Sequence, residues 1–124
     1  MRKILLSINP EFVEQIIKGN KKFEYRTKIA KKDIKAILVY CTYPTKKVVA
    51  KVKIKNILMD APEKLWEKTK AFSGITEDFY KSYFKDHTIA YAYELGDVIE
   101  FKKPRTLKSY GINYAPQSFV YIGI

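Results

Sequence analysis

The sequence predicts one α+β domain that folds as a small closed or half-closed β-barrel flanked by about three short helices. Runs rich in β-branched and aromatic residues recur along the chain, and stretches with helical spacing separate them. The 47% hydrophobic content includes ten Tyr and seven Phe, which is far above the content of a disordered chain. The 124 residues suffice for a single hydrophobic core, so we expect residues 1–124 to form one domain.

A strand and a capped helix are predicted at the start of the sequence. Residues 4–8 form an apolar run, after which Asn9 suits the N-cap and Pro10 suits the first helical position. Apolar residues then recur at helical spacing until Gly19, a residue type that commonly ends helices. We therefore expect a strand at 4–8 and a helix at 10–18.

The middle of the chain has the pattern of an antiparallel hairpin. Residues 37–43 are rich in strand formers, and residues 48–58 follow after a Pro-Thr-Lys-Lys turn. In the second strand lysines alternate with apolar residues, which is typical of a sheet with one face in water. The lysines of this hairpin are thus expected on a solvated face.

The second half of the chain contains two more helix starts and further strand regions. Asp60 has the spacing of a capped helix start, and a further helix is expected near Thr76. That helix is predicted to present four aromatic residues on one side: Phe79, Tyr80, Tyr83 and Phe84. Strands are expected at 88–95 and 98–101, separated by a bend at Gly96-Asp97, and at 118–122.

The charge of the chain favours polyanionic partners. Against 13 acidic residues stand 24 Lys and Arg, which gives a formal net charge of +11. RNA, DNA, nucleotides and anionic membrane surfaces are ligands of such proteins, although a lysine-rich surface also serves solubility alone. The first apolar run is too short to span a membrane, so we expect no membrane association and a cytoplasmic location.

Metal and thiol chemistry are not expected. Cys41 is the single cysteine, and no Cys/His spacing suits structural zinc, so neither a metal site nor a cofactor is predicted. Cys41 shares strand parity with apolar neighbours, which favours a buried structural thiol over a nucleophile.

The segment from Lys21 to Arg26 is the most informative part of the sequence. Its alternation predicts a strand with Phe23 and Tyr25 toward a core and the charged residues Lys22, Glu24 and Arg26 on the opposite face. An arginine fork suits phosphate, and Glu24 is placed to hold that fork in position. A surface ladder of ion pairs with little energetic value is the alternative interpretation.

The same segment carries a resemblance to a known family. Gly19, Lys21, Glu24 and Arg26 match the pattern G-x-K-x-x-E-x-R, which resembles the signature of ASCH domains in the PUA-like superfamily. The opening residues 6–11, the hairpin segment 40–44, the middle segment 74–92 and the closing residues 115–119 are similar to that family in order and position. The resemblance spans nearly the whole chain.

This resemblance implies a PUA-like β-barrel flanked by helices, with a cleft that binds RNA or a modified nucleoside. By the same resemblance Lys21, Glu24 and Arg26 line the cleft, with Tyr40, Thr42 and Ser118 as neighbours. Alternation puts Lys21 on the opposite parity from Glu24 and Arg26, so it reaches the cleft only where the backbone turns.

Two hydrolytic activities are also implied by the family. Some similar proteins deacylate N4-acetylcytidine with a lysine of the signature and a threonine three residues later, but Glu24 stands at that later position here. Others resemble ribonucleases that use Tyr, Lys and Ser, residue types that Tyr40, Lys21 and Ser118 supply. Candidate catalytic residues are therefore Lys21, Glu24, Tyr40 and Ser118.

From these observations we expect an RNA-binding or nucleic-acid-binding module with a basic cleft, active in RNA metabolism or transcription regulation. Lys21, Lys22 and Arg26 are expected to contact phosphate, and Tyr40 or Tyr43 to stack on a base. The alternatives are a small hydrolase, either a ribonuclease or a nucleoside amidohydrolase, and a protein-interaction domain tied to transcription.

Overall fold

Six strands form one mixed sheet in the computed structural model, which describes residues 2–30 and 33–123. The strands lie in the order β2-β5-β4-β3-β1-β6, in which β1 and β3 pair in parallel and the other neighbours pair antiparallel. Their bounds are Lys3–Ile8 for β1, Phe23–Arg26 for β2, Ala36–Cys41 for β3, Lys47–Asp60 for β4, Ala90–Arg105 for β5 and Phe119–Ile122 for β6. The α+β class expected from the sequence is confirmed.

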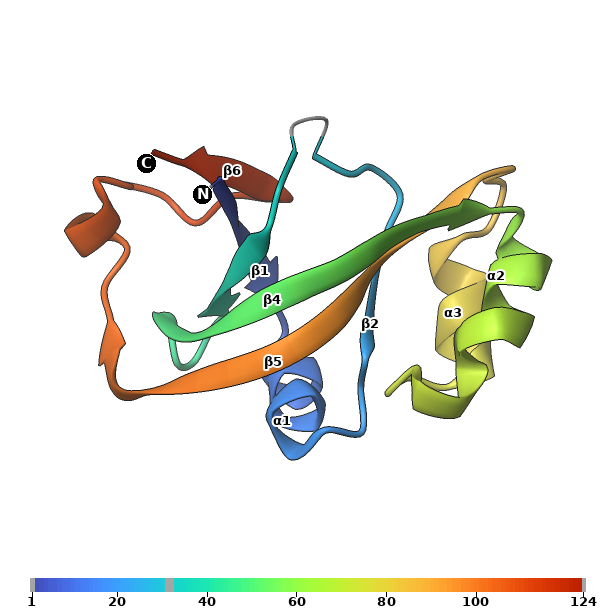
Figure 1. The fold of residues 1–124 in the computed structure, drawn as a ribbon, viewed down its shortest axis with the longest axis horizontal. Helices are drawn as coiled ribbons and strands as arrows, with labels where there is room; N and C mark the ends of the chain where they lie inside the picture. The colour runs from blue at the N-terminus through green and yellow to red at the C-terminus, as the bar shows by residue number, and fades with distance from the viewer. Residues whose placement is uncertain (1, 31–32, 124) are drawn as a thin grey trace.

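Three α-helices flank this curled sheet in the described part of the chain, as Figure 1 shows. Their bounds are Pro10–Lys18 for α1, Pro62–Thr69 for α2 and Glu77–Tyr83 for α3, and the 3-10 turns are Lys70–Phe72 (η1) and Lys108–Tyr110 (η2). The helices α2 and α3 lie together at one end of the long β4 and β5 strands, while β6 lies beside β1 toward the other end (Figure 1).

The α1 helix begins and ends where the local sequence signals predict. Pro10 occupies the first turn, and Asn9 has the extended backbone of an N-cap, although its side chain makes no capping hydrogen bond. Gly19 adopts a left-handed conformation with φ 85°, and its N–H donates to the carbonyl of Ile16. This turn ends the helix and directs the following residues toward β2.

The buried residues of the described chain form three clusters that the alternation of the strands keeps apart. Ile4 and Leu6 of β1 belong to the α1 cluster, together with Val13 and Ile16 of α1, whereas Leu5 between them belongs to another. The α3 cluster comprises Tyr25, Leu65, Tyr80, Phe84, Ala90 and Ala92. The β6 cluster comprises Leu5, Leu38, Tyr40 and Val48, with Val120 and Ile122 packed against it. Residues on opposite faces of β1 and β3 therefore lie in different environments.

Two sequence expectations are wrong in detail. The bend expected at Gly96-Asp97 does not divide the fifth strand: β5 runs through both residues, which form a bulge opposite Lys53 of β4. The four aromatic residues expected on one side of the helix near Thr76 do not share one environment either. Tyr80 and Phe84 are buried, whereas Phe79 and Tyr83 are exposed.

Other expectations hold. Thr76 caps α3 by accepting a hydrogen bond from the backbone N–H of Phe79, and Cys41 is a buried free thiol in the α1 cluster. The N-cap of α2 is Ala61, one residue after the predicted cap Asp60, whose carboxylate accepts a hydrogen bond from the N–H of Ala61. Among the described residues, no helix has both the length and the apolar character needed to cross a membrane.

Candidate functional site

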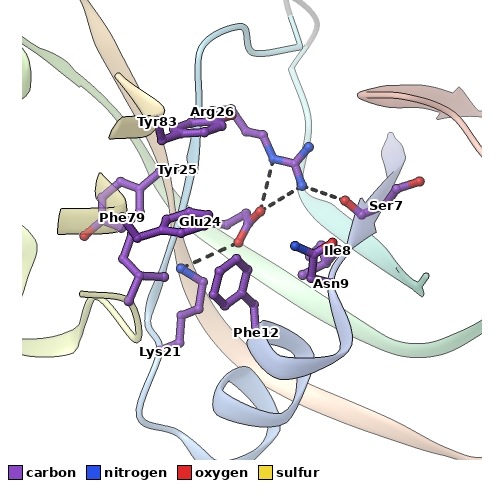
Figure 2. A pocket seen from close by; sticks show the side chains of 11 residues that line it. Ser7, Ile8, Asn9, Phe12, Lys21, Glu24, Tyr25, Arg26, Phe79 and Tyr83 are labelled. Atoms are coloured by element: carbon purple, nitrogen blue, oxygen red, sulfur yellow. Dashed lines mark hydrogen bonds and ion pairs between the residues drawn. The ribbon is translucent and has the colours of Figure 1, made fainter. Parts of the chain in front are cut away.

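A pocket of about 170 Å³ lies where β2 meets the end of β1, the first turns of α1, and α3. Figure 2 shows that its polar centre is formed by Lys21, Glu24 and Arg26, with Ser7 at one side. The remaining lining residues are mostly apolar or aromatic: Ile8, Asn9, Phe12, Tyr25, Ile75, Phe79 and Tyr83. Charged groups thus stand in an otherwise apolar cavity.

Lys21 lies at the floor of the pocket with only 2% of its surface exposed. Its Nζ donates a hydrogen bond of 2.9 Å to the carbonyl oxygen of Ser73 and lies 3.7 Å from Oε1 of Glu24. The same ammonium lies 4.9 Å from the ring centroid of Tyr25 and 5.5 Å from that of Phe12. A buried ammonium is therefore held by one carbonyl, one carboxylate and two ring faces.

Glu24 connects the two cations of the pocket. Its Oε2 accepts hydrogen bonds from Nε of Arg26 at 3.1 Å and from Nη2 of Arg26 at 2.8 Å, while Oε1 faces Lys21 (Figure 2). The Nη2 atom of Arg26 also donates to the carbonyl oxygen of Ser7 at 2.8 Å. Since Ser7 lies near the end of β1 and Arg26 ends β2, this hydrogen bond links two strands that do not pair in the described sheet.

The charges of the pocket favour an anionic or electron-rich ligand. Two cations and one carboxylate leave an excess of one positive charge in a largely apolar cavity, where charges act strongly. Burial lowers the pKa of Lys21 from its ordinary value, and Arg26 lowers it further, while the carboxylate of Glu24 raises it. In the part of the chain that the structure describes, no three His, Cys, Asp or Glu side chains gather as metal ligands would.

The Tyr25 phenol gives a test of burial beside the pocket. Its oxygen lies 2.6 Å from Oγ1 of Thr69, and burial raises its pKa to about 12. Between about pH 10 and about pH 12 the folded state keeps a proton that the unfolded state loses, so stability falls as the pH rises through this range. We expect Tyr25→Phe to lessen that fall, and to cost about 1 kcal/mol at neutral pH because the hydrogen bond is removed.

Denaturant unfolding at neutral and alkaline pH measures both effects. Tyr114→Phe, which removes a phenol with 84% exposure, is the matched control and should follow the wild type at every pH. An equal alkaline loss of stability in the wild type and in Tyr25→Phe would contradict the prediction.

The structure brings together three of the predicted site residues and separates the others from them. Lys21, Glu24 and Arg26 meet in the pocket. Lys22 points away to the surface, where its Nζ lies 4.5 Å from the ring centroid of Phe72. Its neighbour Lys21 reaches the pocket because β2 begins only at Phe23, so the alternation of the strand does not apply to it.

Four predicted site residues, Tyr40, Thr42, Tyr43 and Ser118, do not line the pocket. Tyr40 is buried in the β6 cluster and is the register partner of Ser7, while the half-buried Ser118 directly precedes β6. Thr42 and Tyr43 lie in the hairpin turn, and Tyr43 is 80% exposed. The predicted grouping of Tyr40, Lys21 and Ser118 is thus not assembled, because Tyr40 lies on the other face of the sheet.

The predicted surface position of the charged face of β2 is wrong, whereas its predicted core face is confirmed. Glu24 is 5% exposed and stands opposite Tyr93 in the β2–β5 register, on the side of the α1 cluster. Phe23 and Tyr25 do point toward a core as predicted: Tyr25 is buried in the α3 cluster, and the half-buried Phe23 packs against it. Both faces of this short strand are covered because α1 lies on one side and α3 on the other.

Sequence reasoning missed the residues that hold Lys21 in place. The carbonyl of Ser73 accepts its hydrogen bond, and Gly74, with φ +67°, lies directly against its stem. A Cβ on Gly74 would lie 2.4 Å from Cβ of Lys21, so only glycine fits this close approach. The glycine-containing break between the predicted helices was the one available signal.

The family assignment rests on residues 6–105, which match the family model of the ASCH domain. The chain belongs to the ASCH domain family. The resemblance found in the sequence is thereby confirmed, and the matched range includes every residue of the polar centre of the pocket.

Several relatives of this ASCH chain are known. A protein of Zymomonas mobilis described as an ASCH domain-containing ribonuclease is 29% identical over 97 residues, which are 77% of this chain and 66% of that protein. Two proteins of Ureaplasma parvum match 96% of this chain: one described as ATP synthase subunit alpha, at 29% identity, and one as large ribosomal subunit protein uL22, at 26%. The chain spans 15% and 39% of these two proteins.

Solved ASCH structures share the whole fold. A crystal structure of ASCH from Zymomonas mobilis superposes with a TM-score of 0.89 at 25% identity and covers 98% of this chain and 87% of that one. A variant of the same protein with tyrosine replaced by phenylalanine gives the same TM-score and covers 90% of that chain. The predicted PUA-like fold is confirmed as a six-stranded half-barrel with three α-helices in the described residues.

Proposed function

We propose that this ASCH chain is an RNA-binding module that accepts one unstacked base in the pocket between β2, α1 and α3. The observation that carries the proposal is the buried carboxylate of Glu24 held between Lys21 and Arg26. Building such a group into a core is costly unless its partners are fixed, and here hydrogen bonds hold both cations in place. An arrangement that contributes little net stability and opens onto a cavity suits ligand recognition.

The size of the pocket supports a ring-sized ligand. Pockets for drug-sized ligands hold about 300–1,000 Å³, whereas this cavity measures about 170 Å³. A single planar ring system fits that space better than a whole nucleotide with its phosphate. Sequence-specific RNA recognition uses such insertion, because unstacked bases present both their faces and their edges.

The chemistry of the walls supports a base as that ring. Phe12 and Phe79 meet edge to face with ring centroids 5.2 Å apart, and Tyr83 lines the same side of the pocket. Base edges offer both donors and acceptors, which match the carboxylate of Glu24 and the guanidinium of Arg26. Within residues 2–30 and 33–123, the Nη1 atom of Arg26 has no hydrogen-bond partner, which leaves a donor for a ligand.

Charge and relatives agree with RNA as the partner. The net charge of +11 favours association with a phosphate backbone. The Zymomonas mobilis relative is described as a ribonuclease, an enzyme that acts on RNA. A role of this chain in RNA metabolism follows from the proposal.

Replacing Arg26 tests the proposal. We expect Arg26→Ala to weaken binding of single-stranded RNA of about ten nucleotides by about 10- to 100-fold, since a charge-assisted hydrogen bond contributes about 1.5–3 kcal/mol. Arg26→Lys should restore only part of the affinity, because lysine lacks the planar fork. Fluorescence anisotropy with labelled homopolymers of the four bases measures these affinities.

Arg105→Ala serves as the control. Arg105 is an exposed arginine at the end of β5, and its Cζ lies 4.0 Å from the ring centroid of Phe101. Its removal should change the RNA affinity less than about twofold. If the wild type binds none of the four RNAs at low salt, or if Arg26→Ala and Arg105→Ala behave alike, the proposed function is refuted.

A ribonuclease is the second candidate function, and the Zymomonas mobilis relative described as a ribonuclease favours it. Ser7 is the register partner of Tyr40, and its Oγ donates to the carbonyl of Pro116 at 2.7 Å, close to Ser118 in sequence. Tyrosine and serine are also the types altered in two Zymomonas mobilis variants of known structure. Gel analysis of the same RNAs after incubation distinguishes this activity from binding alone. Deacylation of N4-acetylcytidine is less favoured, because Glu24 replaces the threonine nucleophile.

A further inference from the structure

A shallow basic groove adjoins the pocket on the side of the β4 and β5 strands. Four of its lining residues are lysines, namely Lys21, Lys22, Lys53 and Lys55, and one, Asp97, is acidic. The groove has a volume of about 670 Å³ and is therefore roomier than the pocket. Its excess of positive charge complements a run of phosphates.

The lysines of this groove differ in their partners from four lysines on or beside the helices. Those four form ion pairs with N···O distances of 3.3 Å or less: Lys18 with Glu14, Lys68 with Asp60, Lys70 with Glu67 and Lys81 with Glu77. Among the described residues, Lys22 and Lys53 have no ion pair, and Lys55 reaches Glu94 only at 3.9 Å. The groove thus presents exposed ammonium groups that the protein itself neutralises little.

Irregular pairing of β4 with β5 shapes the groove. The register shifts on both sides of Ile54, whose N–H donates to the carbonyl of Lys35. Gly96 of β5 lies below the stem of Lys55, and a Cβ there would meet Cγ of Lys55 at 3.0 Å. The bulges and the glycine together let the lysine stem lie close against β5.

The groove and the pocket lie next to each other. Lys21 lines both cavities. Each cavity is also lined by a residue of α1, namely Phe12 for the pocket and Ile16 for the groove, and these two residues lie about one helical turn apart. Four residues of α-helix correspond to about 6 Å along the axis. One nucleic-acid strand can therefore contact both cavities within a few nucleotides.

We propose that this groove holds the sugar–phosphate backbone of the strand whose base enters the pocket. The inference rests on the proposed function and narrows it: the ligand is single-stranded RNA of several nucleotides, not a free nucleoside. Lys53, Lys55 and Lys22 contact phosphates, and the exposed ring of Phe72 beside Lys22 gives a face for a neighbouring base.

The test removes groove lysines without touching the pocket. We expect the double variant Lys53→Ala/Lys55→Ala to bind single-stranded RNA of about ten nucleotides about tenfold more weakly at about 50 mM salt. The log–log dependence of its affinity on salt should be shallower by about 0.7 for each phosphate that the variant no longer neutralises. Binding of the four free nucleosides, measured by calorimetry, should be unchanged, because neither lysine lines the pocket.

The matched control is Lys102→Ala/Lys103→Ala, which removes two exposed lysines from β5 outside the groove. An equal loss of affinity in both double variants would mean a diffuse charge effect and would overturn the assignment of the groove. Equal affinity of the wild type for RNA and for a nucleoside would overturn it as well, while leaving a base-binding pocket in place. Absence of binding to every RNA and nucleoside would instead refute the proposed function, and the Arg26 variants report on that separately.

Discussion

Replacing Glu24 by Ala should lower the free energy of unfolding by about 3–5 kcal/mol, because a buried charge would lose its partner. Of their hydrogen-bond and ion-pair partners, Lys21 would keep only the carbonyl of Ser73, and Arg26 would keep only the carbonyl of Ser7. With a typical domain stability of about 5–15 kcal/mol, a loss of this size brings the chain close to unfolding. Urea or guanidinium unfolding measures the change, provided that the slope of the unfolding free energy against denaturant concentration is the same in the variant and the wild type.

An exposed ion pair of the same chain provides the control for this prediction. Oε1 of Glu14 and Nζ of Lys18 in α1 are 2.6 Å apart, and 61% and 57% of these side chains are exposed. Glu14→Ala should therefore leave the denaturant midpoint of unfolding nearly unchanged. The double variant Lys21→Met/Glu24→Gln should recover much of the stability lost in Glu24→Ala, because it removes the unpaired buried ammonium. Equal midpoints for Glu24→Ala and Glu14→Ala would mean that water solvates the centre of the pocket.

Gly74→Ala should destabilise the protein by about 2–5 kcal/mol and weaken RNA binding at the same time. The left-handed backbone costs a residue with a Cβ about 1–2 kcal/mol, and the added methyl overlaps a packed side chain, which costs about 1–3 kcal/mol more. The overlap is with Lys21 itself, at 2.4 Å to Cβ and 2.7 Å to Cγ. The ammonium must therefore leave its position beside Glu24. Denaturant unfolding and RNA anisotropy measure the two effects.

Gly111→Ala separates the two contributions. Gly111 also has a positive φ, +74°, but an added Cβ there meets no atom within 4 Å among the described residues. Its substitution should show the backbone cost alone, with RNA affinity unchanged. If Gly74→Ala costs no more than Gly111→Ala and binds RNA like the wild type, then Lys21 has room to move and the pocket is not a fixed site.

These variants share a physical basis. A buried carboxylate with two cations is expensive to desolvate and depends on well-placed partners, so small changes around it have large effects. The same dependence makes the pocket a rigid set of donors and acceptors, which is what discrimination between bases requires. Surface lysines of the groove, by contrast, should affect RNA affinity while leaving stability nearly unchanged.

Local signals explain why parts of the fold were predictable. Pro10 and Gly19 mark the ends of α1 through their own backbone preferences, and Thr76 marks the start of α3 through its side-chain cap. Hydrophobic alternation likewise gives the first half of β4 its two faces in the β3–β4 hairpin. Such features depend on residues within one turn or one strand, so the sequence states them directly.

Features that depend on distant residues were not predictable in this way. Gly96 has the local preference of a break, yet β5 continues because pairing with β4 outweighs that preference. Phe79 and Tyr83 share the helical spacing of core residues, but only Tyr80 and Phe84 face the buried side of α3. Helical spacing alone does not state how wide the buried stripe is.

For the candidate site, the amino-acid pattern was enough to place Glu24 and Arg26 on one face of a strand after the first helix, and the family signature added Lys21 to them. Three further facts became visible only in the folded chain. Glu24 is buried between the two cations, the backbone of Gly74 packs against the stem of Lys21, and Tyr40 lies on the face of the sheet away from the pocket. The reason is that burial and charge pairing arise when α1 and α3 cover the two faces of β2, and no local pattern records that event.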